Sequence, residues 1–302
     1  MKYLIGIGEI LFDCLPSGKK LGGAPANFAY HATQCGRNGC VVSAIGNDNL
    51  GDEIVRILDN VQMRHQLERV NYPTGTVQIS LSKGGIPQYE ICEGVAYDNI
   101  PYTKELANLA KNAEAVCFGT LAQRSPVSRA TIQKFLDDAC DAVRVFDINL
   151  RENWYSKEVI VSSLARANIL KINDEELNIV APMLLENDEA LALRGTHLAA
   201  DRKCTTEICR RLISKFGLQM LILTCGAEGS FVFSANEISE KKTPKVKVVD
   251  TVGAGDSFTA AFISQILNGK SIAEAHERAV EVSAYVCTQH GAMPKYVIIA
   301  VR

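Results

Sequence analysis

DTVGAGDSFTAAF, residues 250–262, places Gly253, Ala254 and Gly255 between two aspartates. The small and apolar residues that follow have helical spacing, which predicts a helix beginning near Gly255 or Asp256. The first N–H groups of a helix have no partner within the helix, and the helix dipole is positive at that end. Because these three residues carry almost no side chain, a ligand anion can approach the amides closely.

The two aspartates distinguish an anion site from an ordinary capped helix. Asp256 alone would be explained as a helix cap. A cap does not explain the Gly-Ala-Gly sequence before it, nor Asp250 at the end of the strand-like KVKVVD segment at 245–250. A carboxylate beside an anion site can take the proton of a hydroxyl that attacks a phosphorus atom. The stretch therefore favours phosphoryl transfer, with the capped helix as the alternative.

Short apolar runs in the rest of the chain predict strands that are buried on both faces. These runs are residues 3–8, 40–46, 114–119, 142–148, 167–172 and 219–224. Helix-length segments alternate with them, at residues 126–140, 156–166, 174–185 and 201–216. The alternation of strand and helix predicts a parallel sheet between layers of helices, in an α/β fold.

Residues 74–94 break this pattern. Their apolar and polar residues alternate on both sides of KGGIP, which predicts an antiparallel hairpin with one solvated face. Together with the turn-rich residues 12–23, the hairpin is expected to form a small sheet that projects from the main domain. A two-stranded hairpin is marginal alone, so it must pack on the main body, a ligand or a second subunit. Residues 181–203 are expected to form an irregular connection.

Composition excludes several classes of protein. The 302 residues are 47% hydrophobic, enough for one large domain with or without a small appendage. A formal net charge of −2 gives no reason to expect nucleic acid or an anionic membrane as a partner. The ten cysteines include no C-x-x-C pair, which favours free thiols in a reducing compartment over disulfides or a metal site.

The expected location is the cytoplasm. MKYLIGIGEI at the N-terminus is a short apolar run that soon meets acidic residues, unlike a signal peptide. No run approaches the roughly 18 apolar residues needed to span a bilayer.

Residues 250–262 resemble the C-terminal signature of the ribokinase-like (PfkB) carbohydrate kinases. Four further matches occur in the family's order: GEILFDCLP at 8–16, GGAPANFAYHATQCG at 22–36, NDEE at 173–176 and TCGAEG at 224–229. The resemblance runs from residue 8 to Pro294. It implies a three-layer α/β/α sandwich with a mostly parallel central sheet, in a single domain over residues 1–302. Residues 12–23 and 74–94 would form its small β-sheet lid.

The resemblance implies a role for each part of the phosphoryl-transfer site. Asp256 is the expected catalytic base, and Gly253, Ala254 and Gly255 the expected anion hole. The residues expected to bind ATP are Asn173, Glu176, Thr224, Gly226, Gly229, Ala279 and Ser283, with Glu176 also holding Mg²⁺ through water. From the residues alone, Asn173 is equally well explained as a helix cap with acidic residues in the first turn.

The resemblance also implies a potassium site and a sugar site. Potassium would lie near Asp250, Val252, Val286, Gln289 and Gly291, although Lys295 stands where many members have a small hydroxyl residue. The residues expected to bind the sugar are Asp13, Gly23, Asn27, Asn149 and Arg151, with Gln78 or Tyr89 reaching it from the hairpin. Trp154 is expected to pack under its loop instead of stacking on the sugar.

FDINLRENW at 146–154 looks most like the bacterial fructokinases. The expected activity is therefore transfer of the ATP γ-phosphoryl group to D-fructose, giving fructose 6-phosphate. The alternatives are a 2-keto-3-deoxygluconate kinase, a ribokinase or another kinase of the family such as a nucleoside kinase. A catalytically inactive sugar-binding regulator is the alternative outside the enzymes. In this family a lid of this kind commonly pairs with that of a second subunit, so a homodimer is expected.

Overall fold

The computed structural model describes residues 1–15, 18–81, 87–185 and 202–296. Their main sheet has nine strands. In spatial order these are β13 (Ile238–Lys241), β12 (Ser230–Ser234), β11 (Met220–Thr224), β10 (Ile169–Asn173), β9 (Val143–Asp147), β8 (Ala113–Phe118), β1 (Tyr3–Ile7), β4 (Gly39–Gly46) and β5 (Arg64–Val70). In this spatial order, the strands from β11 through β1 to β5 pair in parallel with their neighbours. β12 and β13 are antiparallel additions at the edge beside β11.

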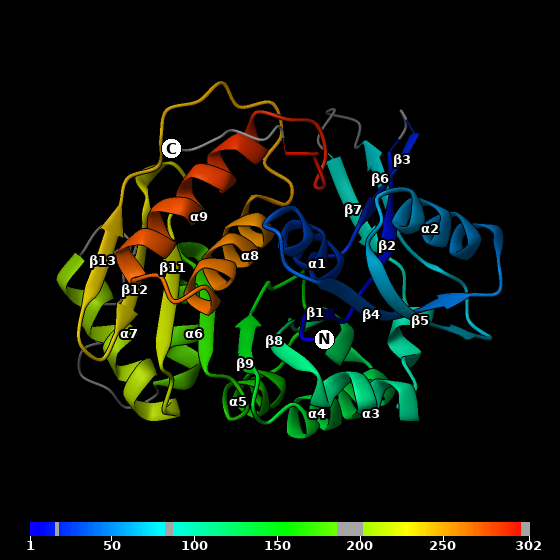
Figure 1. Cartoon of the computed structure of the whole chain (residues 1–302), viewed down its shortest axis with the longest axis horizontal. Helices are drawn as coiled ribbons and strands as arrows, with labels where there is room; N and C mark the ends of the chain where they lie inside the picture. The colour runs from blue at the N-terminus through cyan, green and yellow to red at the C-terminus, as the bar shows by residue number, and fades with distance from the viewer. Residues whose placement is uncertain (16–17, 82–86, 186–201, 297–302) are drawn as a thin grey trace.

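Helices cover both faces of this sheet (Figure 1). One layer holds α1 (Ala24–Gln34), α8 (Ala254–Leu267) and α9 (Ile272–Cys287), with α2 (Asn49–Asn60) beside β4 and β5. The other layer holds α3 (Lys104–Lys111), α4 (Pro126–Asp138), α5 (Lys157–Leu164), α6 (Asp174–Leu184) and α7 (Arg202–Phe216). The predicted three-layer α/β/α architecture is confirmed.

The sheet strands are continuous apolar runs because both of their faces are covered. Every residue of β4 is buried, as is every residue of β1 after Tyr3. Side chains on the two faces enter separate core clusters, one under α3 to α7 and the other under α1, α8 and α9. The six strands and four helices predicted from the sequence are confirmed, with ends shifted by one or two residues.

The order of the strands places a ligand crevice next to β1. The chain runs from β1 to β4 and β5 on one side, and then crosses to β8 on the other side of β1. The crossover makes a topological switch point between β1 and β8. In open α/β sheets, ligands bind beyond the carboxyl ends of the strands at such a point.

A second, four-stranded sheet projects from the main body (Figure 1). It contains β3 (Gly18–Gly22), β2 (Leu11–Leu15), β6 (Gly75–Leu81) and β7 (Pro87–Ile91), in that order. The predicted hairpin is confirmed, because β6 and β7 pair antiparallel; residues 82–86 between them lie outside the described residues. β2 pairs in parallel with β6, so segments far apart in the chain form one sheet.

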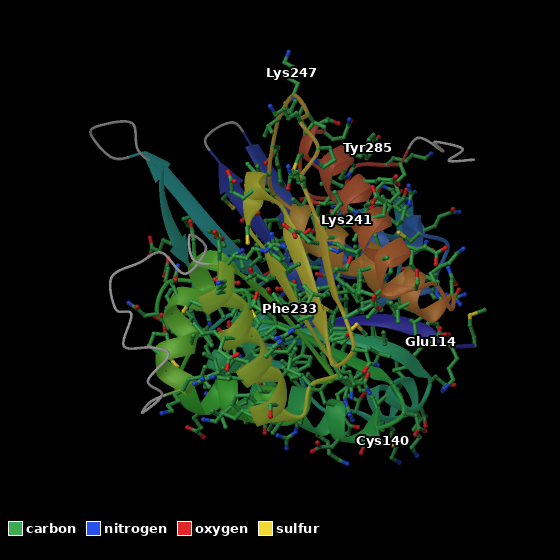
Figure 2. The ribbon with its side chains drawn as sticks, turned by 90° about the vertical axis from the view of Figure 1, so that its left-hand side faces the viewer. Glu114, Cys140, Phe233, Lys241, Lys247 and Tyr285 are labelled. Atoms are coloured by element: carbon green, nitrogen blue, oxygen red, sulfur yellow. The ribbon has the colours of Figure 1, made fainter. Side chains whose placement is uncertain are left out.

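Residues 245–250 are not a strand, contrary to the prediction. Val246 and Val248 are exposed, and Lys247 lies at the outermost point of this segment (Figure 2). The alternation of lysine and valine suits a strand, but the segment leaves the sheet edge after β13, and no strand among the described residues pairs with it. Its end is held instead by α9, where the Val249 amide donates to the Cys287 carbonyl at 2.8 Å.

The remaining structural predictions concern the connection, the cysteines and the membrane. α6 continues to Leu184 and α7 begins at Arg202, so most of the expected irregular connection, residues 186–201, lies outside the described residues. The ten cysteines form no disulfide bond with one another in the described structure. Among the helices that can be described, none has the length and apolar content to cross a bilayer.

Candidate active site

The N-terminus of α8 is half-buried and has no capping side chain. The helix begins at Ala254, and Gly253 before it has a left-handed backbone with φ of 80° and no side chain to cap the helix. The Ala254 amide donates to the Thr251 carbonyl at 3.2 Å. Within the described residues, the next two amides, of Gly255 and Asp256, have no protein acceptor. This helix end therefore offers an anion two directed N–H donors and the positive end of the helix dipole.

Replacing Gly253 by alanine is expected to lower the free energy of unfolding by more than the strain of the left-handed backbone alone would. A Cβ atom at Gly253 would lie 2.6 Å from the Ala292 carbonyl oxygen, so this backbone would have to move. Gly269→Ala is the matched control, because Gly269 has φ of 78° and no atom within 4 Å of the new Cβ. A left-handed backbone costs an L-residue about 1–2 kcal/mol. Urea denaturation should show this loss of unfolding free energy in both variants, with a further loss in Gly253→Ala. Equal losses in the two variants would contradict the prediction.

Asp256 sits in the first turn of α8 and is held by α1. The Asn27 amide nitrogen donates to Asp256 Oδ2 at 2.8 Å, across 229 residues of sequence. Burial raises the pKa of Asp256 to about 6, and the negative charge of Asp147 adds to the effect. Asn27, Lys171 and Arg151 lower the same pKa. A carboxylate with a pKa near neutrality is suited to take up a proton and release it again.

A buried ion pair lies under this turn, and no prediction from the sequence included it. Lys171 Nζ in β10 is 3.1 Å from Asp147 Oδ1 at the end of β9. The other carboxylate oxygen of Asp147 accepts from Thr259 Oγ1 at 3.3 Å, one turn into α8. One signal was present in the sequence, because a lysine inside the apolar ILKIN segment has to be buried with a partner.

Two of the predicted sugar-binding residues, Gly23 and Asn27, lie at the start of α1. Gly23 precedes α1 with φ of 114°, and a Cβ there would lie 2.4 Å from the Glu9 carbonyl oxygen, so only glycine fits. Asn27 follows in the first turn, and its Oδ1 is buried without a partner. Asp13 lies in β2, with its pKa raised by burial and lowered by Arg151 and Lys20.

Glu9 is a second residue that the sequence analysis missed. Its side chain is buried, with 3% of the residue exposed, and Oε2 has no hydrogen-bond partner among the residues that the structure describes. Burial raises its pKa to about 7, against the lowering effect of its own amide, Arg151 and the Ala24 amide. Buried polar atoms are rarely left unpaired, so Glu9 Oε2 and Asn27 Oδ1 mark places where a ligand hydroxyl would be stabilised.

The loop after β9 carries Asn149 and Arg151 and has an unusual backbone at Asn149 and Glu152. Asn149 and Glu152 have φ of 43° and 46°, which non-glycine residues seldom adopt outside constrained sites. Arg151 is exposed, and its charge acts on Asp13, Glu9 and Asp256. Trp154 packs against the core under the Arg124 guanidinium, 4.8 Å from the ring centre, which confirms its predicted packing role.

Asn173 and Glu176 form a complete capping box at the start of α6. Asn173 Oδ1 accepts from the Glu176 amide at 2.7 Å, and Glu176 Oε2 accepts from the Asn173 amide at 2.9 Å. Glu176 Oε1 accepts from the Leu150 amide at 2.9 Å. The helix-cap alternative is thus realised. Since both carboxylate oxygens already accept amides, the pair fits Mg²⁺ only through water, as magnesium often binds. The described residues contain no cluster of acidic, cysteine or histidine ligands for a metal.

The predicted nucleotide residues lie beside this box. Thr224 pairs with Asn173 in the register of β10 and β11, at the carboxyl ends of both strands. Gly226 and Gly229 follow in the turn to β12, with φ of 52° and 129°. On α9, Ser283 is partly exposed, whereas Ala279 is fully buried in the core under α8 and α9.

The predicted potassium residues gather at the end of α9. Asp250 Oδ1 accepts from the Val252 amide and Oδ2 from the Gly291 amide, both at 3.1 Å. The Val286 carbonyl accepts from the Gln289 amide at 3.0 Å. One carboxylate and backbone carbonyls are oxygen donors that suit a monovalent cation. Lys20 of β3 already brings an ammonium to 3.7 Å from Asp250 Oδ2, so positive charge is present here without a metal.

The hairpin residues expected to reach the sugar are only partly described. Gln78 is exposed, and its amide nitrogen donates to Thr76 Oγ1 at 3.4 Å. The side chain of Tyr89 lies outside the described part of the structure, so the choice between these two residues stays a prediction.

Comparisons with known proteins find similar sequences and a similar fold. Residues 17–297 match the pfkB family carbohydrate kinase model. An ATP-dependent 6-phosphofructokinase of Thermoanaerobacterium thermosaccharolyticum is 28% identical, over 93% of this chain and 83% of that protein. The probable fructokinase-2 of Arabidopsis thaliana is 26% identical, over 96% and 92%. The structure of a Xylella fastidiosa fructokinase with bound ATP superposes with a TM-score of 0.79, at 19% identity over 96% and 94% of the two chains.

Proposed function

Because the chain belongs to the pfkB family of carbohydrate kinases, we propose that it transfers the γ-phosphoryl group of ATP to D-fructose, giving fructose 6-phosphate. One observation carries the mechanism: Asp256, with its raised pKa, stands in the first turn of α8 next to unpaired amides. A base and an anion site in one helix turn are the two groups that phosphoryl transfer to a hydroxyl needs.

In the proposed reaction, Asp256 accepts the proton of the sugar hydroxyl as its oxygen bonds to the γ-phosphorus. The bond from that phosphorus to the bridging oxygen of ADP breaks, and the electron pair stays on ADP. The open amides of Gly255 and Asp256, beyond the side-chain-poor Gly253–Gly255 turn, stabilise the negative charge of the phosphoryl group in transit. Mg²⁺, held through water by Glu176 and Asn173, would supply further neutralisation of the phosphates. Asn27 fixes the orientation of the Asp256 carboxylate.

The nucleotide is proposed to lie along the carboxyl ends of β10 and β11. Thr224, Gly226 and Gly229 would contact its phosphates and ribose, and Ser283 would border the adenine. Ala279 would support that slot from the core, since it has no exposed surface. Potassium is proposed to act near Asp250, Val252 and the end of α9, next to the Lys20 ammonium.

Two observations favour a sugar with several hydroxyls as the acceptor. Glu9 Oε2 and Asn27 Oδ1 are buried acceptors without partners, and hydroxyl donors would satisfy both. Fructose is preferred because residues 146–154 look most like those of fructokinases, and the Arabidopsis relative carries that name. Another relative is named for 6-phosphofructokinase activity, so fructose 6-phosphate has to be tested as well.

The small four-stranded sheet is proposed to act as the lid over the sugar and as the contact with a second subunit. Closure would exclude water, which otherwise competes for the phosphoryl group. The enzyme is expected in a reducing compartment such as the cytoplasm, in agreement with cysteines that form no disulfide with one another in the described structure.

The test is ADP release by the purified protein with ATP, Mg²⁺ and K⁺. The panel contains fructose, fructose 6-phosphate, ribose, 2-keto-3-deoxygluconate, adenosine and tagatose. The highest kcat/KM on fructose supports the proposal. A higher value on another compound keeps the kinase mechanism and replaces the substrate. Sugar binding without turnover on any compound would favour the catalytically inactive regulator.

The pH dependence of turnover is expected to follow Asp256. This carboxylate must be ionised to accept a proton, and its pKa is raised to about 6. Activity should therefore be high above this pKa and should fall as the pH drops through about 6. The measurement is kcat/KM for the sugar between pH 5 and 8 at saturating ATP. An acid limb near the ordinary pKa of an exposed aspartate, about 4, would contradict the assignment.

A further inference from the structure

The ion pair between Lys171 and Asp147 lies in an unusual place for two charges. Lys171 is 7% exposed and Asp147 is 4% exposed, and the neighbours Ile169, Leu170 and Ile172 in β10 are completely buried. Removing two charges from water costs about as much as their attraction returns, so such pairs are seldom retained for stability alone. The position of the pair in the fold points to another role.

The ammonium of Lys171 lies directly against the anion-binding turn. A Cβ atom on Gly255 would be 3.0 Å from Lys171 Nζ, so the ammonium occupies the space beside this glycine. Asp147 fixes the ammonium from below at 3.1 Å and also accepts from Thr259 in the next turn of α8. The pair therefore joins the centre of the sheet to the helix end that carries the open amides.

The charge of Lys171 is directed at the reacting groups. Within the described residues, the structure gives its ammonium one hydrogen-bond partner, Asp147, although an ammonium has three donors. The carboxylates of Asp147, Glu176 and Asp256 act on this ammonium. Its positive charge therefore lies among the negative groups of the site.

We propose that Lys171 is a positioning residue for phosphoryl transfer, whose ammonium, fixed by Asp147 beneath Gly255, attracts the γ-phosphate to the N-terminus of α8 and keeps Asp256 ionised. The inference rests on the proposed kinase activity and adds a residue to it. Glycine at position 255 suits this arrangement, since a Cβ there would lie 3.0 Å from Lys171 Nζ and the ammonium would have to shift by a few tenths of an ångström.

The first test compares two substitutions with opposite expected effects. The charged or titratable groups that act on Asp256 are Asp147, Lys171, Arg151, Glu9 and Cys117. Lys171→Met removes a positive charge and should move the acid limb of kcat/KM to higher pH. Asp147→Asn removes a negative charge and should move the limb to lower pH. Lys270→Met, at an exposed lysine paired with Glu274, should leave the limb in place. Loss of activity in both variants without opposite shifts would mean a merely structural role.

The second test needs no turnover. Calorimetry measures binding of ADP and of the non-hydrolysable analogue AMP-PNP, which carries a γ-phosphate. Loss of a hydrogen bond to a charged group costs a factor of about ten or more, so Lys171→Met should weaken AMP-PNP at least tenfold more than ADP. Equal changes for the two nucleotides would overturn the proposal.

The double variant Asp147→Asn with Lys171→Met covers the case in which Lys171→Met does not fold. It removes both charges of the ion pair, so neither partner is left charged without the other, and it should show the same selective loss of AMP-PNP. Wild-type protein that binds both nucleotides but phosphorylates no sugar would contradict the proposed function. The comparison of the two nucleotides would still decide the role of Lys171.

Discussion

Replacing Asp256 by asparagine is expected to lower kcat by about 10²- to 10⁴-fold, the usual range for loss of a general base. Asparagine keeps the size of the side chain and one oxygen that can accept from the Asn27 amide, so the contact at 2.8 Å between α1 and α8 can persist. It cannot take up the proton of the sugar hydroxyl. The measurement is ADP release at saturating sugar and ATP.

The control for this variant is sugar binding without turnover. Calorimetry with the sugar alone should give a Kd close to that of the wild type, because the fold and the neighbouring hydroxyl acceptors are intact. Turnover near the wild-type level would remove Asp256 from its assigned role. Loss of both binding and turnover would assign it to substrate binding instead.

Replacing Arg124 by methionine is expected to cost about 3–5 kcal/mol of unfolding free energy, as for the breaking of a buried ion pair. Arg124 Nε and Nη2 donate to the two oxygens of Asp98 at 2.8 and 2.9 Å, and both side chains are only 7% exposed. Nη2 also donates to the Cys92 carbonyl at 2.5 Å, just beyond β7. Methionine fills much of the space but leaves the Asp98 carboxylate buried without its cation.

Urea denaturation measures this loss against a matched control. Arg278→Met breaks an exposed pair with Glu281 on α9 and should cost no more than about 0.5 kcal/mol. Adding Asp98→Asn to Arg124→Met should recover part of the stability, because the unpaired charge is gone. If the two arginine variants lose similar unfolding free energies, the buried ion pair of Arg124 and Asp98 does not contribute the expected stability.

The central sheet could be predicted because its signal is local. Continuous apolar runs separated by amphipathic segments define β1, β4 and β8 to β11, and these strands are in the structure. The KVKVVD segment has the same local character and is not a strand, since pairing depends on a neighbouring strand that the segment does not have. That residues 12–23 join the hairpin at 74–94 in one small sheet was predicted, but the parallel pairing of β2 with β6 was not, because nothing local specifies which strand is the partner or its direction.

The candidate site was predictable to the extent that its residues lie in motifs. Asn27 and Asp256 were identified separately, and the structure brings them into contact. Lys171, Asp147 and Glu9 were missed because their importance comes from burial and from neighbours on other elements. A charged residue inside an apolar strand was the only local sign of the ion pair.

The contact between Asn27 and Asp256 has a consequence for how the protein is made. Its partners lie 229 residues apart, so a growing chain on the ribosome contains α1 long before α8 has been synthesised. Until then, Phe28 and Ala32 of α1 lack their cover from Phe258 and Phe262, and they present an apolar surface that a chaperone can bind. A product terminated before α8 would therefore keep this apolar surface exposed and would be catalytically inactive. Catalytic activity thus shows that translation has continued past this helix.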